Sequence, residues 1–266
     1  MTPEILPPLF GLLTGFLVGL TGVGGGSLMT PFLMLGAGVP APTAIGTDMV
    51  YATVTKLTGS FQHYRQSSVN LEVAGFLALG SIPASLFGVQ TLEWIKGAFN
   101  PEAVRSIMIT VIAATLVLVG ASLIFRIFMP ERWVGSKQTG WDGKTAMSRR
   151  RRLFTIVFGA FGGYLVGLTS IGSGSVMAVI LLLLYPISPG VVVGTDIAHA
   201  TVLSLVTGIA HMTHGNVDFG LAATLLMGGV PGVLIGSKLS YVLPGRPLKI
   251  ALAAMLVFVG SRLLIG

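Results

Sequence analysis

The chain of 266 residues contains no cysteine and few charged residues. Without cysteine, it has no disulfide, no thiolate metal ligand and no cysteine nucleophile. Asp, Glu, Lys and Arg together make up 9% of the residues, whereas a soluble globular domain carries about 25%. Hydrophobic residues make up 53%. These values exclude a soluble domain, a disordered chain and a coiled coil, and they predict a protein of the lipid bilayer.

The sequence also lacks the alternating segments of a transmembrane β-barrel. Such segments are about 10 residues long with apolar and polar residues in turn, whereas the apolar runs here are uninterrupted and about 20 residues long, the length of a membrane-spanning helix. Because only helices and closed barrels satisfy their backbone groups in lipid, the expected fold class is an all-α polytopic membrane protein.

Basic residues are concentrated in one polar stretch near the middle of the chain. By the positive-inside rule, this stretch is predicted to be a cytoplasmic linker, residues 130–152. Because it adjoins membrane spans, we expect no nucleic-acid partner despite the net charge of +7. The basic residues of the stretch are Arg126, Arg132, Lys137, Lys144 and Arg149 to Arg152.

The sequence repeats itself after 148 residues. The segment from Gly15 to Met29 resembles the segment from Gly163 to Met177. At the same offset and without a gap, Gly46-Thr47-Asp48 superposes on Gly194-Thr195-Asp196. The repeat predicts two homologous halves, a first membrane repeat at residues 1–129 and a second at 153–266.

Each half is predicted to contain one Gly-broken segment followed by three transmembrane helices. Each loop glycine costs about 1 kcal/mol relative to Ala inside a helix, so the broken segments are expected to be re-entrant hairpins with a glycine loop at the tip. A hairpin plus three crossings inverts the second half, and the distribution of Lys and Arg favours such inverted-topology repeats over parallel ones. The broken segments cover about 9–36 and 153–185, and the helices 42–62, 71–93, 103–128, 190–211, 218–240 and 247–265.

The glycine loops are predicted to bind the substrate. Backbone N–H groups at membrane depth have no partner in lipid, and a loop of such groups that opens a helix attracts an anion. The alternative interpretation is that these glycines only permit close helix packing. The predicted substrate-binding residues are Gly24, Gly25, Gly26, Ser27, Thr47, Gly172, Ser173, Gly174, Ser175 and Thr195.

Two carboxylates and one ammonium group are candidates for coupling or charge pairing. Asp48 and Asp196 lie in or beside apolar runs, where a carboxylate is a functional candidate, although either could instead cap a helix. Lys56 follows Asp48 by two helical turns and could pair with it or with the anion, or it could snorkel to the membrane surface. Its equivalent in the second half is Ser204.

The histidines give a weaker signal. His199 takes the place of Tyr51 and lies on the same helical face as Asp196, where it could relay protons or only pack. His63 and His211 recur at span ends and are expected to be half-hydrated. The spacing of Asp196, His199 and His211 is not that of a metal site, so no metal is expected.

Two stretches and their counterparts in the second half resemble a known family. The stretches are Gly-Leu-Thr-Gly-Val-Gly-Gly-Gly-Ser-Leu-Met-Thr-Pro at 19–31 and Ala-Ile-Gly-Thr-Asp-Met-Val-Tyr-Ala-Thr-Val-Thr-Lys at 44–56. They resemble the TauE/SafE sulfite exporter family of membrane permeases, over nearly the whole chain. The resemblance implies carriage of small sulfur-containing anions or organosulfonates in a bacterial inner membrane. Many members carry Gly-Thr-Ser where this chain has Gly-Thr-Asp.

The residues and the resemblance together predict a secondary transporter rather than an enzyme. The sequence has no nucleotide-binding motif, and no cofactor is expected; protons or sodium are the candidate coupling ions. The expected substrate is sulfite, an organosulfonate or a related carboxylate anion, held between the two Gly-rich loops and moved by alternating access. The alternatives are a carrier of a cation or zwitterion such as an amino acid, which would use Asp48, Asp196 and Lys56, and a membrane scaffold subunit that transports nothing.

Overall fold

The computed structural model describes residues 6–21, 26–65, 69–128, 148–185, 189–239 and 245–265, and all regular structure within these ranges is helical. The predicted all-α fold is therefore confirmed. Five stretches are long and apolar enough to cross a membrane, as expected of a multi-pass protein. They are α4 (Leu71–Ala98), α5 (Pro101–Phe128), α6 (Arg149–Thr169), residues Val191–Thr213 of α8 (Pro189–Thr213) and α9 (Phe219–Leu239).

Both Gly-rich segments are broken into separate helices. In the first half, α1 (Leu6–Thr21) is followed by α2 (Gly26–Pro31) and by the π-helical turn η1 (Phe32–Gly36). In the second half, α6 is followed by α7 (Ser175–Leu184). Gly172 in the second break has φ +114°, a conformation that side chains disfavour. The glycines therefore separate the helices where the sequence predicts.

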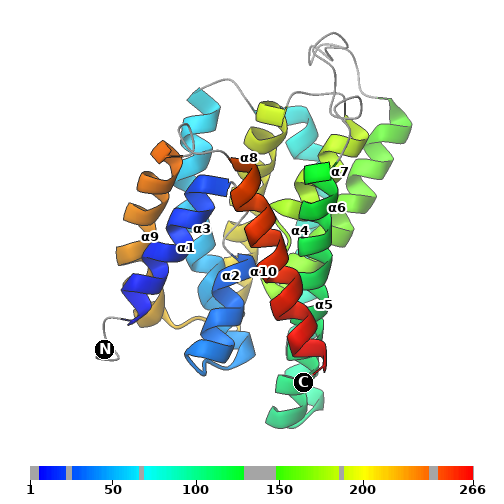
Figure 1. Cartoon of the computed structure of the whole chain (residues 1–266). Coiled ribbons are helices and arrows are strands. Elements are labelled where there is room, and N and C mark those ends of the chain that lie inside the picture. The colour runs from blue at the N-terminus through cyan, green and yellow to red at the C-terminus, as the bar shows by residue number, and fades with distance from the viewer. Residues whose placement is uncertain are drawn as a thin grey trace.

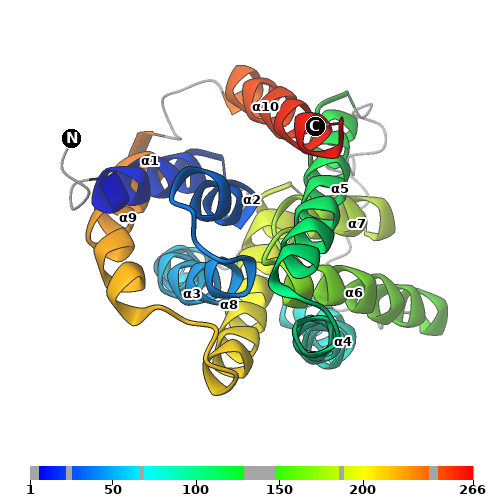
Figure 2. The same cartoon turned by 90° about the horizontal axis from the view of Figure 1, so that it is seen from below.

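Helices α3 (Ala41–Arg65) and α8 lie side by side inside the bundle (Figure 2). They are equivalent in the two halves, since their bounds differ by 148 residues at both ends. Ile45, Asp48 and Tyr51 of α3 are fully buried. Helix α3 is more polar than the five spanning candidates because Asp48 and Lys56 lie on its buried side.

Helices of one half pack against helices of the other. The most extensive contacts join α1 to α9 and α6 to α4, and α5 packs against α10 (Gly245–Ile265). A Cβ added at Gly15 would lie 2.3 Å from the carbonyl oxygen of Gly229, and one at Gly163 would lie 2.2 Å from that of Ser81. Small residues thus let the backbones touch. The glycines of these contacts are Gly11, Gly15 and Gly19 on α1, Gly228, Gly232 and Gly236 on α9, Gly159, Gly163 and Gly167 on α6, and Gly80 and Gly88 on α4.

The end of α5 and the beginning of α6 lie at the upper end of the bundle in Figure 1, whereas the beginning of α1 and the end of α10 lie at the lower end. Residues 129–147, which include most of the predicted linker, are outside the described ranges. The four arginines predicted as the end of the linker belong to the first turn of α6, which Ser148 caps. Arg152 lies 3.6 Å from the carboxylate of Glu72, at the beginning of α4. The arginine run is therefore helical, and its last residue forms an ion pair with the first half.

Candidate functional site

The two broken segments meet inside the bundle. Gly26 is the first residue of α2, and Ser170 follows α6 in the left-handed conformation, with φ 64°. A Cβ added at Gly26 would lie 2.2 Å from the carbonyl oxygen of Ser170 and 3.1 Å from Oδ2 of Asp48. A side chain at position 26 would therefore push the two halves apart. The loops predicted to share the substrate lie against each other at this point; Gly24 and Gly25 are outside the described residues.

Asp48 joins both loops through one carboxylate oxygen. Its Oδ2 accepts hydrogen bonds from the hydroxyl groups of Thr30 on α2, at 2.7 Å, and Ser170, at 2.6 Å. Its Oδ1 is buried and has no hydrogen-bond partner among the described residues. Hydroxyl donors stabilise a buried carboxylate. Asp48 therefore holds the junction together on one side and leaves an acceptor unused on the other.

Lys56 places a positive charge at the loop of the second half. Its Nζ donates a hydrogen bond of 2.6 Å to Oγ of Ser173, which lies between α6 and α7. The side chain is buried, so the ammonium group lies inside the bundle instead of snorkelling to the membrane surface. Lys56 interacts electrostatically with both Asp48 and Asp196. The three charged candidates of the sequence therefore form one group.

Asp196 lies on the other side of Lys56 and is 2% exposed. Its Oδ1 has no hydrogen-bond partner among the described residues. Besides Lys56, Arg126 near the end of α5 interacts with it electrostatically. One turn further along α8, Nε2 of His199 lies 2.7 Å from Oγ of Ser81, and its buried Nδ1 is unpaired within the described part of the chain. Asp196 and His199 therefore present two unused buried polar atoms.

The equivalent position in the first half is built differently. Tyr51 replaces His199, and its hydroxyl donates to the carbonyl of Gly11 at 3.0 Å and lies 3.1 Å from the hydroxyl of Thr14. Ser81 is replaced by Gly229, where an added Cβ would lie 2.3 Å from the Tyr51 ring. A large residue thus faces glycine in one half, and a smaller one faces serine in the other.

Thr47 and Thr195 support the helix ends beside the site. The hydroxyl of Thr47 accepts the backbone N–H of Asp218 at 3.0 Å, and that of Thr195 accepts the backbone N–H of Asn70 at 2.9 Å. Asn70 is the N-cap of α4, and the Asp218 carboxylate accepts the N–H of Leu221 in the first turn of α9. Both predicted threonines are therefore engaged in the same contact, once in each half.

The loop of the second half borders open space. Gly172 is buried, yet a Cβ added to it would meet no atom of the described residues within 4 Å. Gly174 and Ser175 follow at the beginning of α7. In the first half, Ser27 is buried in α2. A small ligand beside Gly172 would reach Ser173, and through it Lys56, without displacing a side chain at position 172.

His211 is not half-hydrated, and that prediction is wrong. It is fully buried because the turn between α8 and α9 covers it. Its Nδ1 lies 3.4 Å from Nδ2 of Asn216, and its Nε2 lies 3.1 Å from the carbonyl of Gly167. Asn216 also bonds to Glu93 and Lys96 near the end of α4. This network links α8 to α6. The side chain of His63 lies outside the described residues.

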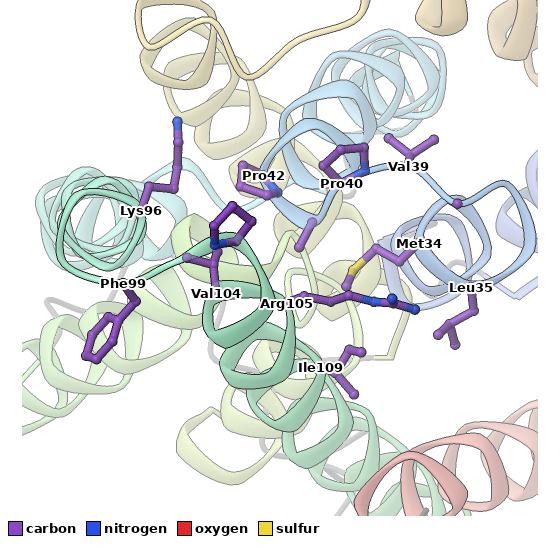
Figure 3. A pocket seen from close by; sticks show the side chains of 13 residues that line it. Met34, Leu35, Val39, Pro40, Pro42, Lys96, Phe99, Val104, Arg105 and Ile109 are labelled. Atoms are coloured by element: carbon purple, nitrogen blue, oxygen red, sulfur yellow. The ribbon is translucent and has the colours of Figure 1, made fainter.

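A pocket of about 560 Å³ opens beside the beginning of α3. Figure 3 shows Arg105 extending from α5 toward Met34 and Leu35, whereas Lys96 points away from it and bonds to Glu93 and Asn216. Asp48 lies two helical turns beyond this pocket along α3. No sequence pattern singles out Arg105, because an arginine at the end of a membrane span is ordinary. The pocket is lined by Met34, Leu35, Gly38, Val39, Pro40, Ala41, Pro42, Lys96, Phe99, Pro101, Val104, Arg105 and Ile109.

Comparisons with known proteins cover nearly the whole chain. Residues 8–263 match the family described as Sulfite exporter TauE/SafE. The chain is 40% identical to the probable membrane transporter protein YjnA of Bacillus subtilis, over 96% of this chain and 98% of that protein. It is 27% identical to the probable membrane transporter protein YdhB of the same organism, over 95% and 96% of the two chains.

A more distant relative is the probable membrane transporter protein MJ0441 of Methanocaldococcus jannaschii, with 22% identity over 98% of this chain and 96% of that protein. No solved structure matches the chain. The family match and the relatives' names agree with the apolar helices of the fold. The chain therefore belongs to the TauE/SafE sulfite exporter family and is a multi-pass membrane transporter.

Proposed function

We propose that this transporter carries a small anion, such as sulfite, an organosulfonate or a related carboxylate, between its two glycine loops. The observation that carries the proposal is the 2.6 Å hydrogen bond from Lys56 Nζ to Ser173 Oγ, which fixes a buried positive charge at the second-half loop. A buried charge needs a partner of opposite sign. An anion beside Gly172 would lie near this charge with no side chain at position 172 in its way.

The beginning of α7 adds to the attraction. Its first backbone N–H groups, around Gly174 and Ser175, have no acceptor within the helix, and the positive end of the helix dipole lies there. Lys56 and these amides reach the same loop from α3 and α7. The proposed site therefore combines a charged donor with neutral donors, which suits an oxyanion with several acceptor atoms.

We further propose that the two halves are inverted repeats that rock against each other in the plasma membrane. The helix directions in Figure 1 support this arrangement, because α1 begins at the lower end of the bundle whereas its equivalent α6 begins at the upper end. Polar side-chain bonds such as those of Asp48 to Ser170 and Lys56 to Ser173 connect the halves at the site, and they can exchange during alternating access. Arg149 to Arg152 at the beginning of α6 support a cytoplasmic linker.

A second candidate is a carrier of a cation or zwitterion. The observation in its favour is that Oδ1 of Asp48 and Oδ1 of Asp196 are both buried without a hydrogen-bond partner among the described residues. An ammonium group could donate to both carboxylates. In that case Lys56 would occupy the place that the substrate takes during transport.

Uptake into proteoliposomes that contain only this protein tests the proposal. We expect uptake of labelled sulfite and competition by organosulfonates. Lys56→Gln should abolish uptake, whereas Lys238→Gln, which neutralises an exposed lysine in the last turn of α9, should not. Competition by amino acids or metal ions but not by sulfonates would favour the second candidate. If no solute enters, the protein is a scaffold and the proposal is wrong.

A further inference from the structure

The charges of the site balance one another before any substrate enters. The buried carboxylates Asp48 and Asp196 both interact electrostatically with the buried Lys56, and Asp196 also interacts with the half-buried Arg126. A monovalent anion would therefore leave one uncompensated negative charge inside the bundle. Such a charge is expensive away from water, so a positive charge must enter together with the anion.

The two carboxylates differ in their hydrogen-bond donors. Asp48 accepts hydrogen bonds from Thr30 and Ser170. At the offset of 148 residues, the positions that correspond to Thr30 and Ser170 are Ala178 and Gly22, neither of which has a hydroxyl group. Hydroxyl donors favour the ionised form of a carboxylate. Asp48 is therefore stabilised as an anion, whereas Asp196 lacks both of these donors.

Among the described residues, few charged or titratable groups lie near Asp196. Lys56 faces it from α3, Arg126 from α5, and His199 lies one turn away on α8 itself. Helix α4 contributes Ser81, which bonds to His199, and α7 has no titratable residue. Lys56 donates to Ser173 in this structure, and Oδ1 of Asp196 is unpaired within the described residues. When an anion pairs with the ammonium group of Lys56, Asp196 loses its main counter-charge.

Resting on the function proposed above, we propose that Asp196 binds the proton that crosses the membrane together with the anion. The anion pairs with Lys56, and a proton from the solvent on the same side binds the Asp196 carboxylate, so that the total charge of the site does not change. After the halves rock, both leave on the other side. Asp48 stays ionised throughout and keeps the loops joined. One anion then travels with one proton, without net charge movement.

Accumulation of labelled sulfite in proteoliposomes with an acidic outside tests this coupling. One proton per anion predicts about tenfold accumulation for each unit of pH difference. Asp196→Asn should lose this accumulation but still exchange external labelled sulfite for internal unlabelled sulfite. Since the protonation of sulfite itself is the same for both proteins, the comparison isolates Asp196. Asp196→Glu, which keeps a carboxyl group, should restore accumulation.

Another carboxylate serves as the comparison. Glu102→Gln neutralises an exposed residue in the first turn of α5 and should behave as the wild type. Exchange by Asp196→Asn together with undiminished accumulation would overturn the proposal, as would accumulation driven by a sodium gradient instead of the pH gradient.

The test also separates coupling from function. If wild-type protein takes up sulfite but the pH gradient has no effect, the coupling is wrong and the anion carrier remains. If no anion enters, the proposed function itself fails. If Asp196→Asn does not fold, the test uses the wild-type protein and labelled isethionate. Isethionate is a sulfonate that carries no proton of its own in the neutral range. A pH gradient must still accumulate it, and failure to do so contradicts the proposal.

Discussion

The equivalent pairs Tyr51–Gly229 and His199–Ser81 allow one half to be rebuilt as the other. We expect Gly229→Ser to destabilise the protein and Tyr51→His to reverse the effect. A Cβ at position 229 would lie 2.3 Å from Cε2 and 2.7 Å from the hydroxyl of Tyr51. The ring cannot retreat easily, because it is fully buried and its hydroxyl bonds to Gly11. The second half solves the same problem with a smaller ring that bonds to serine at 2.7 Å.

The overlap sets the size of the effect. Overpacking of this kind costs about 1–3 kcal/mol, and Tyr51→His alone costs about the same, because it leaves a cavity and removes the phenol hydrogen bonds. In the double variant the serine fills the space that the phenol vacates. We expect a coupling energy of at least about 1 kcal/mol that favours the double variant. Thermal unfolding in detergent measures this coupling energy as a shift of the melting temperature. The shift is about 2–4 °C per kcal/mol for chains of 150–250 residues.

Gly75→Ser is the matched control. An added Cβ at Gly75 in α4 would meet no atom within 4 Å in the part of the chain that the structure describes, so this variant reports the effect of serine in a helix without a clash. Its stability should stay near that of the wild type. The equivalence of the two pairs is refuted if the double variant is as unstable as the sum of the single variants. It is also refuted if Gly229→Ser is as stable as Gly75→Ser.

Three further predictions test topology, the pocket and the threonines. Because the chain has no cysteine, single cysteines at the exposed equivalent positions Leu71 and Phe219 should label from opposite sides of the membrane; labelling from one side contradicts inverted repeats. Arg105→Gln should slow anion uptake a few-fold, most at low salt, whereas Arg262→Gln in α10 should not, and equal rates would exclude Arg105 from the entry route. Thr47→Val should lower stability by about 0.5–1.5 kcal/mol with unchanged substrate affinity, since its hydroxyl holds Asp218; weaker binding at normal stability would place it on the substrate.

The helices and their breaks could be predicted from the sequence because lipid imposes long apolar runs. The expected helix at 42–62 corresponds to α3 (Ala41–Arg65), and the one at 190–211 to α8 (Pro189–Thr213). The breaks at the glycines also follow from local chemistry, because consecutive glycines are unfavourable in a helix. The sequence identifies Asp48, Lys56 and Asp196 as individual candidates but does not show that all three lie together. Their common location depends on how α3 meets α8, which a single sequence does not reveal.

Other features depend on contacts between distant segments. Ser170 was not predicted, although it donates to Asp48, because its first-half equivalent is Gly22 and the repeat gave no reason to select it. His211 was misjudged because the depth of a helix end depends on the turn that covers it. Gly11, Gly15 and Gly19 of α1 follow a four-residue spacing that indicates close packing against another helix. That spacing could have been found from the sequence, and its partner helix could not.

Some contacts occur in both halves of the molecule, whereas those around the buried charges occur in one half. Thr47 with Asp218 and Thr195 with Asn70 make the same bond in each half, and the packing of α1 on α9 matches that of α6 on α4. A duplicated scaffold must support both halves, so such contacts recur. By contrast, Asp48 but not Asp196 has two hydroxyl donors among the described residues, and Lys56 has serine as its equivalent. A single small substrate between two halves is not symmetric, so the residues that bind it need not be either. The loss of symmetry around Lys56, Asp48 and Asp196 is therefore an independent argument that the substrate passes there.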